Sequence, residues 1–178
     1  NYVWPGGLSH DLPPKFIEKT HEFLDYFIPQ IDEYNQVLTT NKIFIERSAD
    51  VGVLPLDVGI NYGVTGPSLR GSGSNFDLRK EEPYSVYNKF DFNVPVGEGL
   101  MGTVGDCWDR YYVRVLEMKE SVKIIRQALE SIPSGDVHEV LPKKIRPPKG
   151  EVYSRYESAR GDVGFYIRSA GKSMPDRL

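Results

Sequence analysis

The sequence predicts a mainly α-helical fold in which long antiparallel helices form a bundle core, with an ordered glycine-rich loop and a C-terminal β-hairpin. Two observations predict the helices, because residues 14–38 and 105–132 both carry apolar side chains at steps of three and four. A third predicts the hairpin, since two segments rich in β-branched and aromatic residues flank a turn within residues 151–168. At 178 residues, the chain is long enough to bury one sizeable core.

The first helix is predicted over residues 14–38. Pro13 and Pro14 suit a first helical turn, where missing N–H donors cost little. Pro29 lies inside the pattern and removes an internal hydrogen bond, so we expect two segments or one bent helix. The apolar stripe comprises Phe16, Ile17, Phe23, Leu24, Phe27, Ile28, Ile31, Tyr34, Val37 and Leu38.

The second helix is predicted from Asp106, as N-cap, to a stop at Pro133 and Gly135. The stripe is Tyr111, Val115, Met118, Val122, Ile125, Leu129 and Ile132, and the expected outer face is Glu117, Lys119, Glu120 and Lys123. Two long helices with facing stripes can bury each other, which predicts an antiparallel pair packed at a shallow angle.

Glycine and proline interrupt the chain between these helices. Residues 41–64 are predicted to form short helical pieces, whereas residues 66–92 show no sustained period. Such a loop is unusual in a compact domain unless it is functional or disordered. Its aromatic residues favour burial, so we predict an ordered binding or docking loop; they are Phe76, Tyr84, Tyr87, Phe90 and Phe92.

The C-terminal part begins with residues 142–150, a basic connector stiffened by proline. Strands are predicted over residues 151–157 and 163–168, with residues 158–162 as the turn. An isolated hairpin is marginally stable in water. We therefore expect the helices, or strands from outside this chain, to cover it.

Composition excludes several function classes. The formal net charge of −3 lacks the basic excess of a nucleic-acid-binding surface. No apolar run approaches the ~20 residues that span a bilayer, and no targeting peptide is visible. The single cysteine, Cys107, and three scattered histidines (His10, His21 and His138) show no metal-ligand spacing. A reducing compartment is the simpler interpretation.

The segment Gly63–Gly73 has the glycine content of a ligand-binding loop but matches neither phosphate-binding pattern. It also lacks a nucleophile elbow, so Ser68 and Ser72 have no assignable acid–base partner. Two interpretations stay open. The glycines either relieve strain in a surface turn or let the backbone approach another subunit or a cofactor, with Arg70 and Arg79 offering planar charge.

Two further segments place opposite charges beside aromatic residues: residues 77–80 and residues 106–111. The simpler interpretation is local ion pairing and helix capping. The alternative is a buried polar network through Asp106, Asp109 and Arg110 that fixes the loop against the second helix.

The same segments resemble a known family. The run Gly63–Lys80, the pair Pro83-Tyr84-x-x-Tyr87, the run Gly105–Tyr111 and the motif Arg114-x-x-Glu117-Met118 are similar to the 49 kDa subunit of respiratory complex I. This family, a subunit (type D) of NADH-quinone oxidoreductase, is related to the nickel-iron hydrogenase large subunit. Residues 2–13 and the Pro-Asp-Arg at 175–177 resemble it too, although Trp4 stands where the family commonly has arginine.

The resemblance implies that residues 1–178 are a single domain or a central fragment of a larger hydrogenase-like subunit. It implies electron transfer from NADH to quinone coupled to ion translocation, in a cavity beside the Fe–S cluster of a neighbouring subunit. Quinone, NADH, FMN and Fe–S clusters belong to the parent complex, and this chain is expected to contribute no catalytic, cofactor-binding or metal-binding residue. The histidine and tyrosine that bind the quinone head would precede Asn1.

The expected partners are other complex I subunits, above all the adjacent Fe–S subunit. The expected location is peripheral, on the cytoplasmic face of the bacterial inner membrane or the equivalent matrix side. As a hypothesis, four residues dock the loop against the subunit that carries the Fe–S cluster and polarise the loop there: Arg70, Asp77, Arg79 and Lys80. Two alternatives remain. One is the large subunit of a membrane-bound nickel-iron hydrogenase or formate hydrogenlyase, and the other is a non-catalytic helical scaffold.

Overall fold

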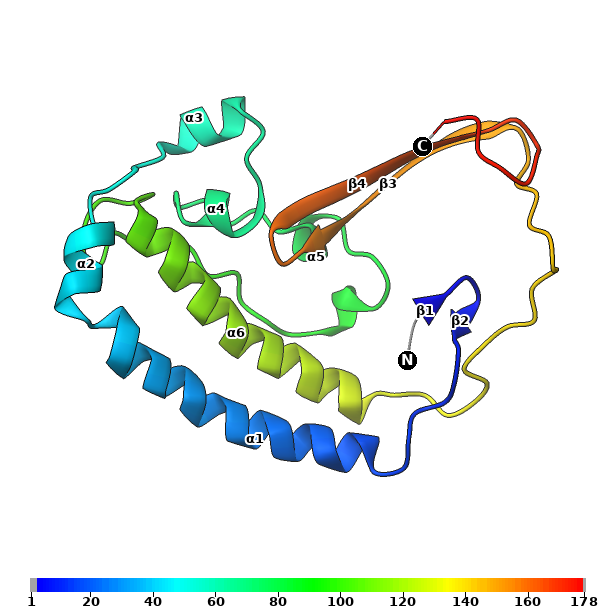
Figure 1. Cartoon of the computed structure of the whole chain (residues 1–178), viewed down its shortest axis with the longest axis horizontal. Coiled ribbons are helices and arrows are strands. Elements are labelled where there is room, and N and C mark those ends of the chain that lie inside the picture. Colours follow the sequence, from blue (N-terminus) through cyan, green and yellow to red (C-terminus); the bar gives the residue numbers. More distant parts are fainter. Residues whose placement is uncertain (1–2, 178) are drawn as a thin grey trace.

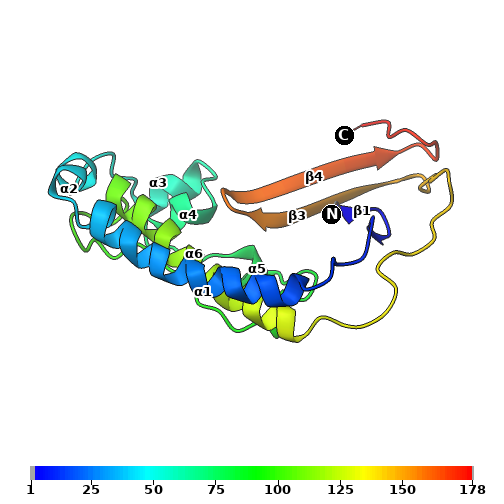
Figure 2. The same cartoon turned by 60° about the horizontal axis from the view of Figure 1, so that its bottom comes forward.

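The computed structural model describes residues 3–177 and confirms a mainly helical fold with a C-terminal β-hairpin (Figure 1). Helices α1 (Phe16–Tyr34) and α6 (Cys107–Glu130) run side by side in opposite directions (Figures 1 and 2). Their shared core is made of Leu24, Val122 and Leu129, with Phe27 packed against it. At the margin of this contact, the Arg126 guanidinium lies 2.5 Å from the Asp25 carboxylate.

Helix α1 continues through Pro29 as one helix rather than two segments. The ring removes one N–H donor, but buried Leu24 and Ile31 on either side hold the helix against its neighbours. A π-helical turn, η1 (Asn35–Thr39), follows directly and ends the rod.

Helix α6 begins as predicted, because the Asp106 carboxylate accepts the Asp109 N–H at 2.8 Å. It ends at Glu130, before the predicted stop at Pro133. The predicted stripe is buried at Val122 and Leu129, whereas Ile125 is exposed. Ile132 is exposed because it lies beyond the last residue of the helix.

The short helices predicted between the long ones are present as α2 (Lys42–Ser48) and α3 (Leu56–Asn61). The glycine-rich loop differs from its prediction, because it contains α4 (Gly66–Arg70), α5 (Leu78–Glu81) and the 3₁₀ turn η2 (Tyr87–Lys89). A helix of one turn is too short to leave a periodic signal. Leu69, Leu78 and Phe92 are buried, so the loop is packed into the fold.

The hairpin strands are β3 (Gly150–Ser158) and β4 (Gly161–Ser169). They are longer than predicted, and Ser158 pairs with Gly161, so two residues make the turn instead of five. Gly161 has φ +128°, which glycine adopts without strain. The turn end of the hairpin lies against α4 and α5, and the open end extends away from the helices (Figures 1 and 2).

A small hairpin near the start of the chain was not predicted. Strands β1 (Val3–Trp4) and β2 (Gly7–Leu8) pair with each other, and Gly7 also bridges to His138 in the segment after α6. Within residues 3–177, no helix has both the length and the apolar character required to cross a lipid bilayer.

Candidate functional site

The candidate site is centred on Arg70, which is 2% exposed. Its Nε atom donates to Glu117 Oε1 at 2.7 Å, and its Nη1 atom donates to Glu157 Oε1 at 3.0 Å. The same Nη1 atom lies 3.5 Å from Asp77 Oδ2 and donates to the Phe76 carbonyl at 3.1 Å. One guanidinium therefore joins α4, the start of α5, helix α6 and strand β3.

Glycines bring these elements close enough for the contacts to form. Gly66 has φ +65°, and a Cβ at this position would clash with the backbone of Gly161 in the hairpin turn. Beside it, Thr65 Oγ1 accepts the Asp162 N–H at 3.0 Å. A Cβ on Gly97 would likewise clash with the carbonyl of Gly71. The close approach that these glycines permit is to other segments of the same chain.

Asp77 and Arg79 form a second ion pair next to Arg70. The Asp77 carboxylate caps α5 through the Arg79 N–H at 2.9 Å, and it accepts from Arg79 Nη2 at 2.7 Å. The Arg79 guanidinium lies over the Phe92 ring, 5.0 Å from its centroid. We refer to Arg70, Asp77, Arg79, Glu117 and Glu157 as the Arg70 cluster.

Burial and charge shift the cluster's pKa values in opposite directions. Burial raises the pKa of Asp77, but the hydrogen bonds and charge of Arg79, with the charge of Arg70, outweigh it and hold the pKa below its ordinary value. Burial also raises the pKa of Glu117, and here Arg70 does not compensate fully. The pKa of Asp77 is thus lowered and that of Glu117 raised, so Glu117 gains a proton more readily than Asp77.

Tyr84 ties the hairpin to the loop beside the cluster. Its hydroxyl donates to the Glu157 carbonyl at 3.3 Å and accepts the Glu157 N–H at 3.2 Å. Burial raises the pKa of Tyr84 above its ordinary value, so it stays a neutral donor. Arg155 adds ion pairs to Glu82 and, at 3.0 Å, to Asp162.

A polar pocket of about 380 Å³ lies against the cluster. Arg70, Arg79, Glu117 and Glu157 line it, together with Arg114 and Met118 of α6. Among residues 3–177, no three or more His, Cys, Asp or Glu side chains are grouped to hold a metal ion. What the arrangement can do chemically is fix the position of its elements and exchange a proton at Glu117.

The second predicted network lies at the start of α6. Asp106 Oδ2 accepts the Asp50 N–H at 2.9 Å, and Asp109 Oδ2 accepts the Gly99 N–H at 3.0 Å. Burial raises the pKa of Asp109. Arg110 donates to the carbonyls of Gly105 and Gly52, the latter at 2.8 Å, and to Cys107 Sγ at 3.1 Å. Asp106, Asp109 and Arg110 thus connect the segments before α6 to its first turn.

The four residues of the docking hypothesis occupy different environments. Arg70 and Asp77 are buried against this chain's own side chains, and Arg79 is half-buried. Lys80 is exposed, with its Nζ 4.3 Å from the Phe92 ring centroid. Only Arg79 and Lys80 therefore reach the surface.

Sequence reasoning missed Glu117 and Glu157 as partners of Arg70. The placement of Glu117 on the outer face was wrong, because its side chain turns toward α4 and is only 18% exposed. The local sequence carries no signal for this, because Arg114 and Glu117 have the i,i+3 spacing of an ordinary exposed ion pair on a helix. Nothing in the local sequence points to Glu157.

Comparisons with known proteins cover the whole chain. A family model described as the respiratory-chain NADH dehydrogenase 49 Kd subunit matches residues 1–147 and 138–178. The chain is 51% identical over 176 residues to an NADH-quinone oxidoreductase subunit (type D) of Chlorobium luteolum, covering 97% of this chain and 45% of the relative. It is 52% identical over 176 residues to the same subunit of Chlorobaculum tepidum, with 97% and 44% covered.

A third relative is an NADH-quinone oxidoreductase subunit (type D 1) of Cytophaga hutchinsonii, 51% identical over 180 residues, which cover 97% of this chain and 46% of the relative. The chain therefore spans less than half the length of these curated relatives. The matches extend over both long helices, the Arg70 cluster and the hairpin. Because the similarity is this extensive, the chain belongs to the 49 kDa subunit family of the respiratory-chain NADH dehydrogenase.

Proposed function

We propose that this chain is a central part of a subunit that forms the quinone cavity of NADH-quinone oxidoreductase, next to the Fe–S cluster of a neighbouring subunit. In this role it takes part in electron transfer from NADH to quinone coupled to ion translocation. The family match over the whole chain and the names of its relatives support the proposal. They also favour it over a nickel-iron hydrogenase or formate hydrogenlyase.

The observation that carries the proposal beyond the family is the Arg70 cluster. It joins four elements from distant parts of the chain through one buried guanidinium. Buried ion pairs fix geometry more reliably than they add net stability. In this proposal the chain stabilises one wall of the quinone cavity. The redox chemistry belongs to NADH, FMN, the Fe–S clusters and quinone in the rest of the complex.

In the proposed arrangement, the docking residues act from two sides. Lys80 and Arg79 face the Fe–S subunit, whereas Arg70 and Asp77 hold the loop from within. The other complex I subunits are the partners. The location that follows is peripheral, on the cytoplasmic face of the bacterial inner membrane or the equivalent matrix side.

The test is Arg70→Ala in the full-length subunit, assembled in the whole complex. We expect quinone reductase activity to fall while NADH oxidation by an artificial acceptor is spared, because that reaction bypasses the cavity. Arg70→Lys keeps the charge but loses the planar fork, so it should show a smaller loss of the same kind. Lys42→Ala, on the exposed face of α2, is the control that should change neither activity.

Assembly is measured in parallel by native electrophoresis. If both Arg70 variants assemble and retain full quinone reductase activity, the wall role is wrong. If the complex lacks quinone-dependent turnover altogether, the chain is a non-catalytic scaffold instead.

A further inference from the structure

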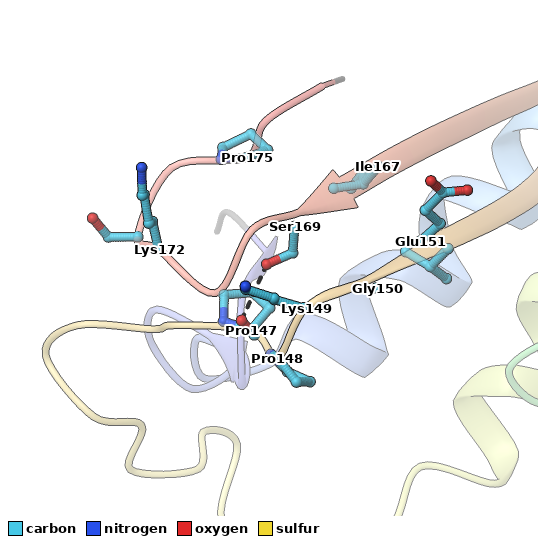
Figure 3. Close-up of a pocket in the computed structure, with 11 residues that line it drawn as sticks. Pro147, Pro148, Lys149, Gly150, Glu151, Ile167, Ser169, Lys172 and Pro175 are labelled. Carbon is cyan, nitrogen blue, oxygen red and sulfur yellow. Dashed lines mark hydrogen bonds between the residues drawn. The ribbon is translucent and has the colours of Figure 1, made fainter.

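The open end of the hairpin carries a pocket that is separate from the Arg70 cluster. Its volume is about 480 Å³, and it lies between the basic connector and the segment after β4 (Figure 3). The Ser169 hydroxyl donates to the Pro147 carbonyl at 3.1 Å and joins the two sides. This bond is drawn as a dashed line in Figure 3.

The pocket has an apolar wall and a positively charged rim. Pro147, Pro148, Val152 and Ile167 contribute the wall, and Lys149 and Lys172 lie at the rim. Figure 3 shows the Glu151 carboxylate directed away from both lysines. An apolar centre inside a polar rim is the usual composition of a protein–protein contact.

The positive charge extends beyond the pocket. Residues 142–150 carry four basic side chains and no acidic one, although the chain as a whole has a net charge of −3. Within the described part of the chain, no ion pair engages these four or Lys172, whereas Arg155 and Arg168 nearby are paired. All five cations lie on exposed residues: Lys143, Lys144, Arg146, Lys149 and Lys172.

The length of the charged strip indicates the kind of ligand. A proline-rich extended chain rises ~3.1 Å per residue, so the cations from Lys143 to Lys149 spread over roughly 15–20 Å. That is longer than a small anion, and a flat lipid surface would leave the recess unfilled. Proline also limits the freedom that the connector loses on binding.

We propose that this surface docks an acidic segment of a partner polypeptide, with one large apolar side chain of that segment in the pocket. Carboxylates of the segment pair with Lys149 and Lys172, and further acidic residues follow the connector toward Lys143. This docking proposal rests on the proposed function in one respect, because it takes the partner to be another subunit of the assembled oxidoreductase.

The test is zero-length carbodiimide cross-linking of the purified complex, followed by identification of the joined peptides. We expect Lys149 and Lys172 to be linked to aspartate or glutamate of one segment of another subunit, with a large apolar residue close by in that segment. The Lys119–Asp32 pair, 3.1 Å apart in this chain, is the internal control for the chemistry. If that pair is linked while Lys149 and Lys172 remain unlinked, the docking proposal is wrong.

A variant tests the charges directly. The double change Lys149→Glu and Lys172→Glu removes two linkable amines, so the readout is the set of cross-links from Lys143 and Lys144 to the same segment. Their yield should fall roughly tenfold, since reversed rim charges repel an acidic segment. Lys42→Glu on α2 is the matched control and should leave the yield unchanged. Val152→Ser, which alters the wall at an exposed strand position, should lower the yield without changing charge.

A membrane is the competing ligand. The full-length subunit is mixed with vesicles of phosphatidylglycerol and phosphatidylcholine, and co-flotation is measured. Charge-dependent flotation together with unlinked lysines in the complex would replace the partner polypeptide by a lipid surface. If NADH-quinone oxidoreductase is purified without this subunit, the proposed function is wrong. That result differs from unlinked lysines in a complex that contains the subunit, which contradicts only the docking proposal.

Discussion

The buried guanidinium of Arg70 has no substitute among the side chains around it. Removing it leaves Asp77, Glu117 and Glu157 close together, and among the described residues only Asp77 then keeps an ion pair, with Arg79. We expect Arg70→Met to lower the free energy of unfolding of the full-length subunit by about 3–5 kcal/mol, as for other broken buried pairs. Chemical unfolding measures the loss.

Lys119→Met is the control for that experiment. The Lys119–Asp32 pair is exposed on both sides, so the change should cost only ~0–1 kcal/mol. If Arg70→Met and Lys119→Met lower the free energy of unfolding equally, burial of the Arg70 cluster does not add to its effect on stability.

Glu117 should make unfolding depend on pH in a specific direction. Burial raises the pKa of Glu117 in the folded state, so the protonated side chain favours folding. This stabilisation is fully present below the ordinary pKa near 4.5 and is lost as pH rises through the folded-state pKa. Glu117→Gln, which can still accept from Arg70, should therefore leave stability unchanged near pH 4 and preserve or raise it at pH 7. Thermal unfolding across pH checks this.

Asp77 provides the opposite case. Its pKa is lowered, so it stabilises the fold above its ordinary value near 3.8, and this contribution is lost as pH falls through the folded-state value. Asp77→Asn should destabilise the protein at pH 7 and lose its effect in acid. The two opposite pKa shifts are contradicted if Asp77→Asn is better tolerated at pH 7 than Glu117→Gln.

At this scale, the sequence reveals contacts that are local. The Asp106 cap is predictable because its acceptor and donor lie three residues apart. The pairing of Arg70 with Glu157 spans 87 residues and depends on where the hairpin packs. No pattern of neighbouring residues carries that information.

Among the elements, α1 contains an internal proline that the fold tolerates. Pro29 is exposed, and a proline within a helix costs roughly 3 kcal/mol relative to alanine. We expect Pro29→Ala to raise the unfolding free energy by about 1–3 kcal/mol, measured by thermal unfolding of the full-length subunit. A loss of stability would mean that the ring packs against a partner at this site.

The contact between α4 and the hairpin turn can be tested with two glycines of similar conformation. Gly66 and Gly63 have φ values of +65° and +68°, so alanine strains the backbone equally at both. Only Gly66 faces a second backbone, since nothing lies within 4 Å of a Cβ on Gly63. Gly63→Ala should cost about 1–2 kcal/mol from strain alone, and Gly66→Ala clearly more. Similar losses for both would contradict the close packing.

Elements were predictable in proportion to their length. Helices α1 and α6 repeat their pattern over several turns, and the nine-residue hairpin strands are rich in β-branched and aromatic residues. Helices α4 and α5 have one turn each and are set by Gly66 and by the Asp77 cap rather than by a period. They are visible only once the surrounding structure is known.

For the molecule as a whole, apolar surface remains on the long helix and the hairpin. Phe23 is 54% exposed on α1, and Tyr153 and Phe165 are 62% and 50% exposed on β3 and β4. The chain spans less than half of its relatives, so we expect the rest of the subunit and its neighbours to cover these faces. The 178-residue chain alone should then bind a hydrophobic fluorescent dye more strongly than the full-length protein; equal binding would show that these faces stay open.

The general fold was predictable at this scale because it follows from helix periodicity and from two segments of β-branched and aromatic residues that flank a turn. The function was not predictable from those patterns, and it entered through resemblance in the motifs of residues 63–80 and 105–118. These motifs coincide with the Arg70 cluster and the start of α6. Their residues hold elements together, which explains why their chemistry alone does not indicate a reaction.

Gly66 and Gly161 meet so closely that they restrict where the chain length can vary. Neither backbone has room for an added atom, and the turn between the strands is already as short as a hairpin allows. Within the hairpin, insertions and deletions that preserve this contact should then fall at the far end, where the strands open. The two stretches matched by the family model overlap at residues 138–147, which include the first part of the connector leading to that end.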